Sequence, residues 1–213
     1  MSEAMEPREN GRARRAVFFD RDGTLNEEVG HMDQLGRFRL FPFAGRAVRE
    51  VNEAGLLAIV VTNQSGVGRG MFPEELVQAV HERLERAMGS AGARLDGIYY
   101  CPHHPQAEIE QYRVECACRK PAPGMMEQAA ERFGIRLEES FVIGDRYVDV
   151  EMAHRTGAAS VLVLTGFGRE EWERERDRWP QQPEHVAENV YDAVQWVLGQ
   201  MRGSHRGTEP QRK

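Results

Sequence analysis

The sequence predicts an α/β fold in which a parallel sheet is wound with helices on both faces. Three observations carry this prediction. Apolar runs alternate with segments of helical spacing, glycines close most of those segments, and polar residues follow directly on the apolar runs. With 213 residues and 40% hydrophobic content, the chain is long enough for one domain with a substantial core. We therefore expect a single domain at residues 15–201 and disordered ends at 1–14 and 202–213.

Five apolar runs are predicted to be buried strands. They lie at residues 16–19, 56–62, 97–101, 141–145 and 160–166. A segment of helical spacing separates each consecutive pair of runs. The strands would therefore be joined by helices and run parallel, as in repeated βαβ units.

Four segments with the apolar spacing of a helix lie between these runs, and a fifth follows them. They cover residues 44–55, 73–92, 122–134, 149–158 and 186–201. Pro73 suits a first helical turn, and a glycine stands at or near the end of each of the first four segments, where helices commonly stop. The charged run at 169–184 is interpreted as a solvated loop or a short helix.

Polar residues gather where the predicted strands end, and open α/β sheets bind ligands at that edge. These residues are Asp20, Asp22, Thr62, Asn63, Gln64, Ser65, Gly144 and Asp145. The sequence therefore predicts a functional site at the carboxyl ends of the strands.

The stretch DRDGT, residues 20–24, places Asp20 and Asp22 on either side of one arginine. Two carboxylates this close repel, so we expect Mg²⁺ between them, completed by a third carboxylate from Asp145. Such a pair suits phosphoryl transfer, in which the first carboxylate attacks phosphorus and the second supplies and removes protons. The plainer alternative is an Asp-rich turn that pivots on Gly23.

Two further segments would serve a phosphoryl group. TNQSGVGRG, residues 62–70, offers the Thr62 hydroxyl and backbone N–H groups in a glycine-rich turn, with a plain loop as the alternative. Lys120 is the only lysine besides the last residue, in a chain that otherwise uses arginine, which indicates a position that needs a compact ammonium. We expect Lys120 to balance the charge on the phosphoryl oxygens.

All three cysteines lie in one short window together with two histidines. The order Cys101, His103, His104, Cys116, Cys118 predicts a closed tetrahedral Zn²⁺ site of three thiolates and one imidazole, with free core cysteines as the alternative. The spacing alone does not choose between the two histidines. Because a loop of this length lacks a core of its own, the metal would supply its order.

Arg119 and Lys120 follow the last cysteine directly, so the metal would hold both at the mouth of the site. The bidentate fork of Arg119 suits a second anionic group on the substrate, although it also fits an exposed loop arginine. The segment EEVGHM, residues 27–32, is the other expected recognition surface. No inserted segment is long enough for a cap domain, which favours small substrates.

Together these motifs resemble those of the haloacid dehalogenase-like phosphohydrolases across residues 15–166. The matching stretches are DRDGT, VVTNQSG, Lys120 before a proline, and VIGDRYVD. Within that superfamily, DRDGTLN, TNQSGVGRG, YYCPHHP and CACRKPAPGM are similar to the D-glycero-D-manno-heptose 1,7-bisphosphate 7-phosphatases and the related histidinol-phosphatases. The resemblance implies a Rossmann-like haloacid dehalogenase fold with a zinc-binding loop and no large cap domain.

The resemblance also implies roles for individual residues. Asp20 would be the nucleophile that becomes an aspartyl phosphate, Asp22 the general acid/base, and Thr62 and Lys120 the groups that hold the phosphoryl group. Mg²⁺ would bind Asp20, the backbone carbonyl of Asp22, and Asp145, while Asp149 is a less defined second carboxylate of the last motif. Zn²⁺ would bind Cys101, His103, Cys116 and Cys118.

The expected substrate contacts come from all of these segments. The residues are Asp20, Arg21, Asp22, Glu28, Val29, Gly30, His31, Thr62, Asn63, Gln64, Ser65, Arg119 and Lys120. We expect a Mg²⁺-dependent phosphomonoesterase that removes the 7-phosphate of the heptose bisphosphate, with Arg119 on the other phosphate. Histidinol phosphate remains the alternative substrate, since Glu27 and Glu28 would attract its cationic groups.

A non-catalytic zinc-binding adaptor is the alternative of another class, but it would not need both aspartates, the lysine and the third carboxylate together. The net charge of −6 and the lack of a basic groove or stacking platform argue against nucleic acid as a partner. The chain has neither an apolar run near the ~20 residues of a membrane span nor the apolar core of a signal peptide. We expect a cytoplasmic monomer that acts on a small phosphorylated metabolite.

Overall fold

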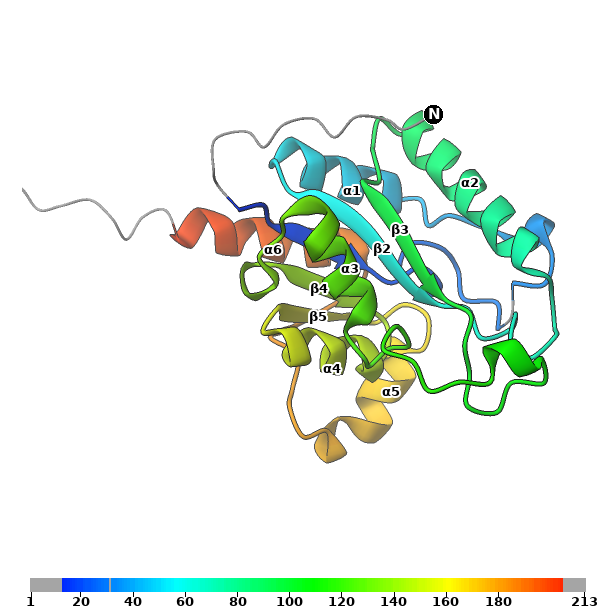
Figure 1. Ribbon diagram of the computed structural model, residues 1–213. Helices are drawn as coiled ribbons and strands as arrows, with labels where there is room; N and C mark the ends of the chain where they lie inside the picture. The colour runs from blue at the N-terminus through cyan, green and yellow to red at the C-terminus, as the bar shows by residue number, and fades with distance from the viewer. Residues whose placement is uncertain (1–12, 31, 205–213) are drawn as a thin grey trace, which may run out of the picture.

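Six parallel strands form the central sheet of the part of the chain that the structure, a computed structural model, describes: residues 13–30 and 32–204 (Figure 1). The strands are β1 Ala16–Phe19, β2 Leu57–Asn63, β3 Gly97–Cys101, β4 Phe141–Gly144, β5 Ala159–Val163 and β6 His185–Ala187. Their order across the sheet is β3-β2-β1-β4-β5-β6, and every neighbouring pair is parallel. The chain thus winds away from β1 on one side and then on the other, which is the predicted doubly wound topology.

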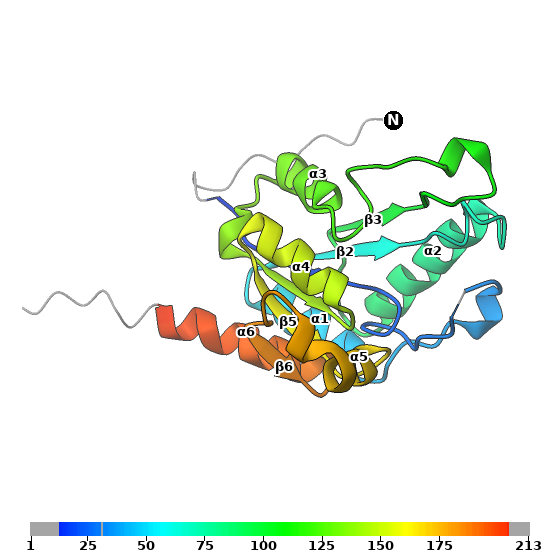
Figure 2. The ribbon, with the colours of Figure 1, turned by 90° about the horizontal axis from the view of Figure 1, so that it is seen from below.

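Helices cover both faces of this sheet (Figures 1 and 2). They are α1 Ala44–Glu53, α2 Glu74–Ser90, α3 Gly124–Phe133, α4 Tyr147–Thr156, α5 Gly168–Glu175 and α6 Val190–Ser204, with 3-10 turns at Leu35–Arg37, Glu110–Tyr112, Leu137–Glu139 and Arg176–Arg178. Helices α1, α2 and α6 pack on one face, and α3 and α4 pack on the other. No helix in the described part of the chain combines the length and apolar character that crossing a bilayer requires.

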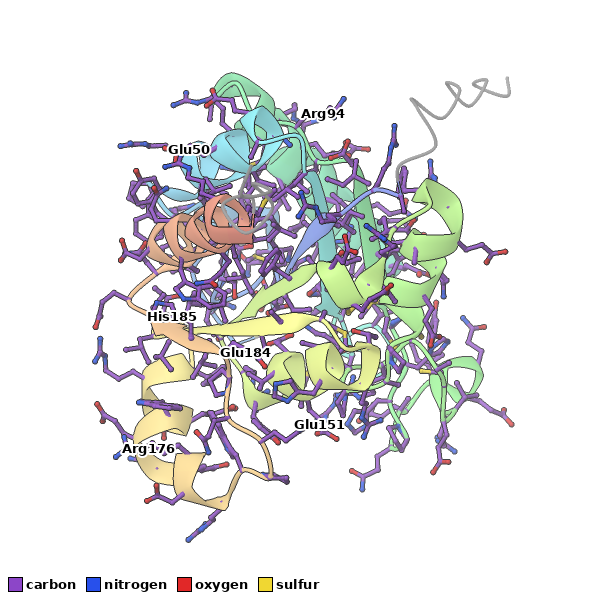
Figure 3. The ribbon with its side chains drawn as sticks, turned by 90° about the vertical axis from the view of Figure 1, so that its left-hand side faces the viewer. Glu50, Arg94, Glu151, Arg176, Glu184 and His185 are labelled. Atoms are coloured by element: carbon purple, nitrogen blue, oxygen red, sulfur yellow. The ribbon has the colours of Figure 1, made fainter. Side chains whose placement is uncertain are left out.

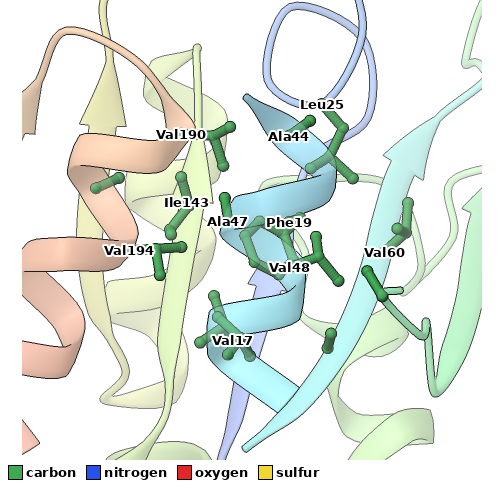
Figure 4. Packing of buried hydrophobic residues seen from close by; sticks show 14 of the residues in the cluster. Val17, Phe19, Leu25, Ala44, Ala47, Val48, Val60, Ile143, Val190 and Val194 are labelled. Atoms are coloured by element: carbon green, nitrogen blue, oxygen red, sulfur yellow. The ribbon is translucent and has the colours of Figure 1, made fainter. Parts of the chain in front are cut away.

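The larger core cluster fills the layer between the sheet and helices α1, α2 and α6. Figure 4 shows Val17 and Phe19 of β1 beside Val48 of α1, and Ile143 of β4 beside Val194 of α6. All five side chains have no solvent-accessible area. Successive strand residues point to opposite faces of the sheet. Ala16 and Phe18 of β1 therefore join the second cluster, under α3 and α4. The fully apolar runs of the sequence therefore serve two cores at once.

The segment between β1 and α1 carries a single 3-10 turn at Leu35–Arg37 and no inserted domain over its described residues, 20–30 and 32–43. The carboxyl ends of the strands therefore have no large cap there, as the sequence predicts. The charged run at 169–184 contains α5 and a 3-10 turn, which agrees with the short-helix interpretation.

Strand β6 was not predicted, because residues 186–201 were assigned entirely to a helix. In the structure Val161–Val163 of β5 pair with the three residues of β6, and α6 begins only at Val190. Glu184, beside His185 at the edge of the sheet in Figure 3, accepts hydrogen bonds from the backbone N–H (2.6 Å) and hydroxyl (2.7 Å) of Ser160. The strand exists because of this pairing with a distant segment, and its three residues carry no recognisable pattern alone.

Regular structure extends slightly beyond the predicted domain limits of 15 and 201. The Arg14 backbone pairs with Ile135, and its N–H lies 3.0 Å from the Gly134 carbonyl. At the other end α6 continues to Ser204. The remainder of both predicted tails lies outside the described residues.

Candidate active site

The ends of β1, β2 and β4 meet around a cavity of about 300 Å³. Asp20 follows β1, Thr62 is the next-to-last residue of β2, and Asp145 follows β4. The side chains and backbone that line the cavity belong to Asp20, Asp22, Glu28, Gly30, Met32, Thr62, Asn63, Gln64, Ser65, Gly66, Phe72, Arg119, Lys120, Arg146, Val148, Asp149 and Phe167. The sheet topology alone brings these sequence-distant segments to one edge.

Asp20 and Lys120 form a buried ion pair within this cavity. The Lys120 Nζ lies 2.6 Å from Asp20 Oδ1, 2.6 Å from Asp149 Oδ1 and 3.1 Å from the Val61 carbonyl. Two reciprocal hydrogen bonds hold the Lys120 backbone, one from its N–H to Asn63 Oδ1 (3.1 Å) and one from Asn63 Nδ2 to its carbonyl (3.2 Å). Asn63 therefore holds the lysine against the end of β2.

Three buried carboxylates, those of Asp20, Asp145 and Asp149, offer oxygen atoms within 4.8 Å of one another. Burial and repulsion by Asp20 and Asp149 raise the pKa of Asp145 well above its ordinary value. Burial likewise raises the pKa of Asp20 to about 6, although Lys120 opposes that shift. Lys120 supplies one positive charge against three carboxylates, so the group carries excess negative charge when ionised.

A hard divalent cation fits this donor set. Asp145 Oδ2 accepts the Phe167 N–H at 2.9 Å, but the buried Asp145 Oδ1 has no hydrogen-bond partner in the described structure. A buried carboxylate oxygen without a donor is costly unless a cation meets it. Carboxylate oxygens are also the protein ligands that Mg²⁺ prefers.

Two glycines make room for the Asp145 carboxylate. A Cβ on Gly23 would lie 2.2 Å from Asp145 Oδ2, and one on Gly166 would lie 2.1 Å from the same atom. Both glycines also have positive φ, +83° and +56°. The DRDGT turn and the turn after β5 therefore need glycine to close around the carboxylate.

Asp22 lies at the wall of the cavity with its carboxylate held from behind. It accepts hydrogen bonds from Arg21 Nε (3.1 Å) and Nη2 (2.6 Å), Asn26 Nδ2 (2.9 Å) and Gln64 Nε2 (2.9 Å). Burial favours the neutral acid, but the Arg21 charge and these hydrogen bonds outweigh it and lower the pKa of Asp22. Gln64 Nε2 also donates to Thr62 Oγ1 at 2.9 Å, which links the Asp22 carboxylate to the hydroxyl on β2.

Arg21, a predicted substrate contact, does not line the cavity. Its side chain is fully buried behind Asp22, and its Nη1 lies 3.1 Å from Nε2 of His81 on α2. Burial and the neighbouring guanidinium lower the pKa of His81 to about 3. This histidine was not among the predicted site residues.

Two guanidinium groups and one carboxylate line the outer wall. Arg119 Nη1 donates to the His103 carbonyl at 3.1 Å, and Arg146 Nε donates to Glu171 Oε1 at 2.7 Å. The Arg146 guanidinium also stacks 5.2 Å from the centre of the Phe167 ring. Burial and repulsion by Asp22 raise the pKa of Glu28 to about 7. The wall is thus positive at two points beside one readily neutralised acid.

The predicted zinc ligands lie together beside this wall. The three Sγ–Sγ distances among Cys101, Cys116 and Cys118 are 3.1, 3.3 and 3.6 Å, and His103 Nδ1 lies 3.3 Å from Cys118 Sγ and 3.7 Å from Cys101 Sγ. A tetrahedral site with Zn–S bonds of about 2.3 Å separates sulfur atoms by about 3.8 Å, so the four donors are spaced for one ion. His104 is turned away, with Nε2 2.8 Å from Arg69 Nη2.

The structure thus brings together most of the residues that the sequence analysis selected, with three exceptions. Arg21 is enclosed, the Val29 side chain packs against the core, and His31 lies outside the described residues. Arg146 and Phe167 on the cavity wall were not among the predicted site residues. Arg146 follows directly on the Asp145 motif, which is a usable signal, but nothing in the sequence marks Phe167.

The chain matches a known protein family and is similar in sequence to phosphatases. Residues 117–193 match the HAD-hydrolase-like family model. The chain is 36% identical over 199 residues to the D-glycero-beta-D-manno-heptose-1,7-bisphosphate 7-phosphatase of Escherichia coli strain K12, covering 93% of this chain and 95% of that protein. It is 38% identical over 188 residues to the D-glycero-D-manno-heptose-1,7-bisphosphate 7-phosphatase of Thermosynechococcus vestitus, covering 86% and 95%.

A solved structure shares the fold closely. The crystal structure of D,D-heptose 1,7-bisphosphate phosphatase from B. bronchiseptica, complexed with magnesium and phosphate, superposes with a TM-score of 0.77 at 29% identity and covers 87% of this chain and 99% of that one. Family model, sequence relatives and fold agree with the site geometry above. The chain belongs to the D-glycero-D-manno-heptose-1,7-bisphosphate 7-phosphatase family of haloacid dehalogenase-like hydrolases.

Proposed function

We propose that this phosphatase removes the 7-phosphate of D-glycero-D-manno-heptose 1,7-bisphosphate through an aspartyl phosphate on Asp20. The observation that carries the proposal is the buried contact of Asp20 with Lys120, 2.6 Å, beside two more carboxylates at the floor of a small cavity. A nucleophilic carboxylate needs a cation to screen it from an anionic phosphate, and this floor combines one ammonium with a donor set for a second cation.

The chain's own groups divide the reaction between them. An Asp20 oxygen attacks phosphorus and the sugar oxygen leaves, while Lys120 and the Thr62 hydroxyl hold the phosphoryl oxygens. Asp20, Asp145 and the Asp22 carbonyl would hold Mg²⁺, with Asp149 close by. When bound, the ion would offset the carboxylate charge and polarise the phosphoryl group. Water then releases phosphate from Asp20 and restores the carboxylate.

Asp22 is the proposed general acid and base. Its low resting pKa means that the free enzyme holds it ionised, which suits a base but not an acid. A phosphate dianion placed between Asp20 and Asp22 would raise the pKa of Asp22 by repulsion. Substrate binding itself would therefore favour protonation of the Asp22 carboxylate. The protonated carboxyl then donates to the leaving sugar oxygen, and the carboxylate later takes a proton from the attacking water.

The substrate preference rests on the outer wall. Arg119 and Arg146 both line the cavity, and two guanidinium groups suit the second phosphate of a bisphosphate better than the amine and imidazole of histidinol phosphate. On the outer wall, the Glu28 carboxylate would favour a cation, but its raised pKa weakens that attraction near neutral pH.

We further propose that Cys101, His103, Cys116 and Cys118 hold Zn²⁺ in a structural role. The four donors would fill a tetrahedral coordination shell and leave no position for substrate. Zinc would fix the loop that leads into Arg119 and Lys120. We also propose that the enzyme acts as a cytoplasmic monomer on this small metabolite and binds no nucleic acid.

The test is phosphate release from the α and β anomers of the heptose bisphosphate and from histidinol phosphate, each with and without Mg²⁺. The Asp20→Asn variant serves as the blank. We expect Mg²⁺-dependent release that strongly prefers one bisphosphate anomer. Faster hydrolysis of histidinol phosphate would overturn the substrate, and equal rates for Asp20→Asn would overturn the mechanism.

The Arg119→Ala variant tests the second-phosphate contact separately. We expect its kcat/KM for the bisphosphate to fall much further than its kcat/KM for a simple sugar monophosphate. Equal losses on the two substrates would show that Arg119 does not bind the second phosphate.

A further inference from the structure

Arg21 is among the largest fully buried side chains of the described structure, and its guanidinium stays protonated in proteins. Its guanidinium donates to Asp22 through Nε and Nη2 and meets His81 through Nη1 at 3.1 Å. The ion pair occupies only one side of the guanidinium. His81 provides the partner on the opposite side.

The chemistry of this contact fixes the state of the imidazole. A guanidinium has only N–H donors, so Nε2 of His81 must accept, and the ring proton must sit on Nδ1. The ring is held by an edge contact with Tyr100, whose centroid lies 5.5 Å away, and the Tyr100 hydroxyl donates to Glu74 Oε1 at 2.6 Å. The acceptor that faces Arg21 therefore has little freedom to move.

Only the far end of this chain of contacts reaches the cavity. His81 and Arg21 are enclosed, whereas the Asp22 carboxylate keeps about a fifth of its side-chain surface exposed (20%) at the cavity wall. We propose that His81 is a positioning residue, which orients Arg21 so that the Asp22 carboxylate faces the leaving group. The proposal deepens the proposed function, because it rests on Asp22 acting as the general acid and base.

A matched pair of variants tests the acceptor. In His81→Gln the amide oxygen reaches the place of Nε2, whereas in His81→Asn the same amide is one methylene shorter and falls short of Arg21. We expect His81→Asn to lower kcat by about 10- to 100-fold, because small misplacements of a reacting group cost that much. KM should stay within about twofold, since His81 does not touch the cavity. His81→Gln should recover most of the loss.

The leaving group sharpens the readout. A 4-nitrophenolate leaves without a proton, so the burst of nitrophenol in the first turnover should be nearly normal in His81→Asn, while the first turnover of an alkyl phosphate should be slow. Equal losses on both substrates would overturn a role through Asp22. So would a His81→Gln variant as slow as His81→Asn.

Leu84→Ala, in the same helix and fully buried, controls for loss of stability. It should lower Tm without lowering kcat at 25 °C. If it lowers kcat as far as His81→Asn does at a comparable Tm, the effect is general loosening of α2 and the proposal is wrong.

Crystal structures of the Gln and Asn variants separate this proposal from the proposed function. We expect the Arg21–Asp22 contacts to persist in His81→Gln and to lengthen or rearrange in His81→Asn. Unchanged contacts in His81→Asn would overturn the positioning role whether or not the wild type hydrolyses any given substrate. Displaced contacts together with an inactive wild type would leave the geometry correct and the proposed function wrong.

Discussion

Two polar clusters lie side by side in this protein and are held together in different ways. The carboxylates around Lys120 come from the ends of β1 and β4 and from α4, so the packed sheet brings them together despite their repulsion. Three of the four Cys and His donors come from the loop that follows β3, and only Cys101 ends a strand. The packing of a sheet can hold like charges close together at its edge despite their repulsion. A loop without a core of its own instead needs a metal to give it order.

The sharpest test of the first cluster is Asp20→Asn. Activity should fall on the order of 10³-fold or more, because removal of a nucleophile abolishes the covalent route. Tm should change little, because the substitution removes one of three crowded carboxylates while Lys120 keeps Asp149. Phosphate release and thermal unfolding measure the two effects. A large loss of Tm would show that Asp20 supports the fold as well.

Lys120→Met should break the balance of charges in the same cluster. Leaving the carboxylates without their cation should cost about 3–5 kcal/mol of unfolding free energy, and it should lower kcat/KM by about 10²- to 10³-fold. Added Mg²⁺ should restore part of the stability. Denaturant unfolding with and without Mg²⁺ provides the measurement, and Lys120→Arg is the control that keeps the charge. Unchanged stability in Lys120→Met would mean that the carboxylates are not ionised together.

The second cluster is tested by two neighbouring histidines. His103→Ala should lose bound zinc and lower kcat by about tenfold or more, since Arg119 and Lys120 would lose their anchor. His104→Ala should keep zinc and nearly all activity, because His104 faces Arg69 instead. Metal analysis by mass spectrometry and kinetics on both variants provide the readout. Zinc loss in His104→Ala alone would reverse the ligand assignment.

The smallest effect is expected from Glu28 at the cavity wall. Its folded-state pKa of about 7 lies above the ordinary 4.5, so between these pH values the folded protein binds more protons than the unfolded chain. Stability should therefore fall as pH rises from about 4.5 to about 7 and level off above that, and Glu28→Gln should remove that part of the decline. Tm measured from pH 5 to pH 8 without added Mg²⁺ tests this. Parallel Tm curves for wild type and variant would show that Glu28 titrates normally.

Much of this organisation could be predicted from local pattern. The first five strands, the alternation with helices and the residues at the strand ends follow from apolar runs and the polar residues behind them. Lys120 was recognisable because the chain uses lysine at only one other position. The clustering of cysteines and histidines at residues 101–118 likewise predicted a site with four metal ligands, although spacing alone did not separate His103 from His104.

Other features depend on contacts between segments far apart in the sequence. Strand β6 forms against β5, Phe167 reaches the cavity from the turn after β5, and His81 meets Arg21 across 60 positions of sequence separation. No local pattern encodes such pairs, because each side chain alone is also compatible with an ordinary surface or core position.

The sequence by itself determined the fold class and the chemistry available at the strand ends, since periodicity and residue type are local properties. Only the tertiary structure decided which carboxylate faces the substrate and which charge is enclosed. Arg21 shows the reason: it stands between two aspartates in the sequence, yet the turn buries it behind one of them. Burial and direction depend on what packs against a residue, and those partners come from elsewhere in the chain.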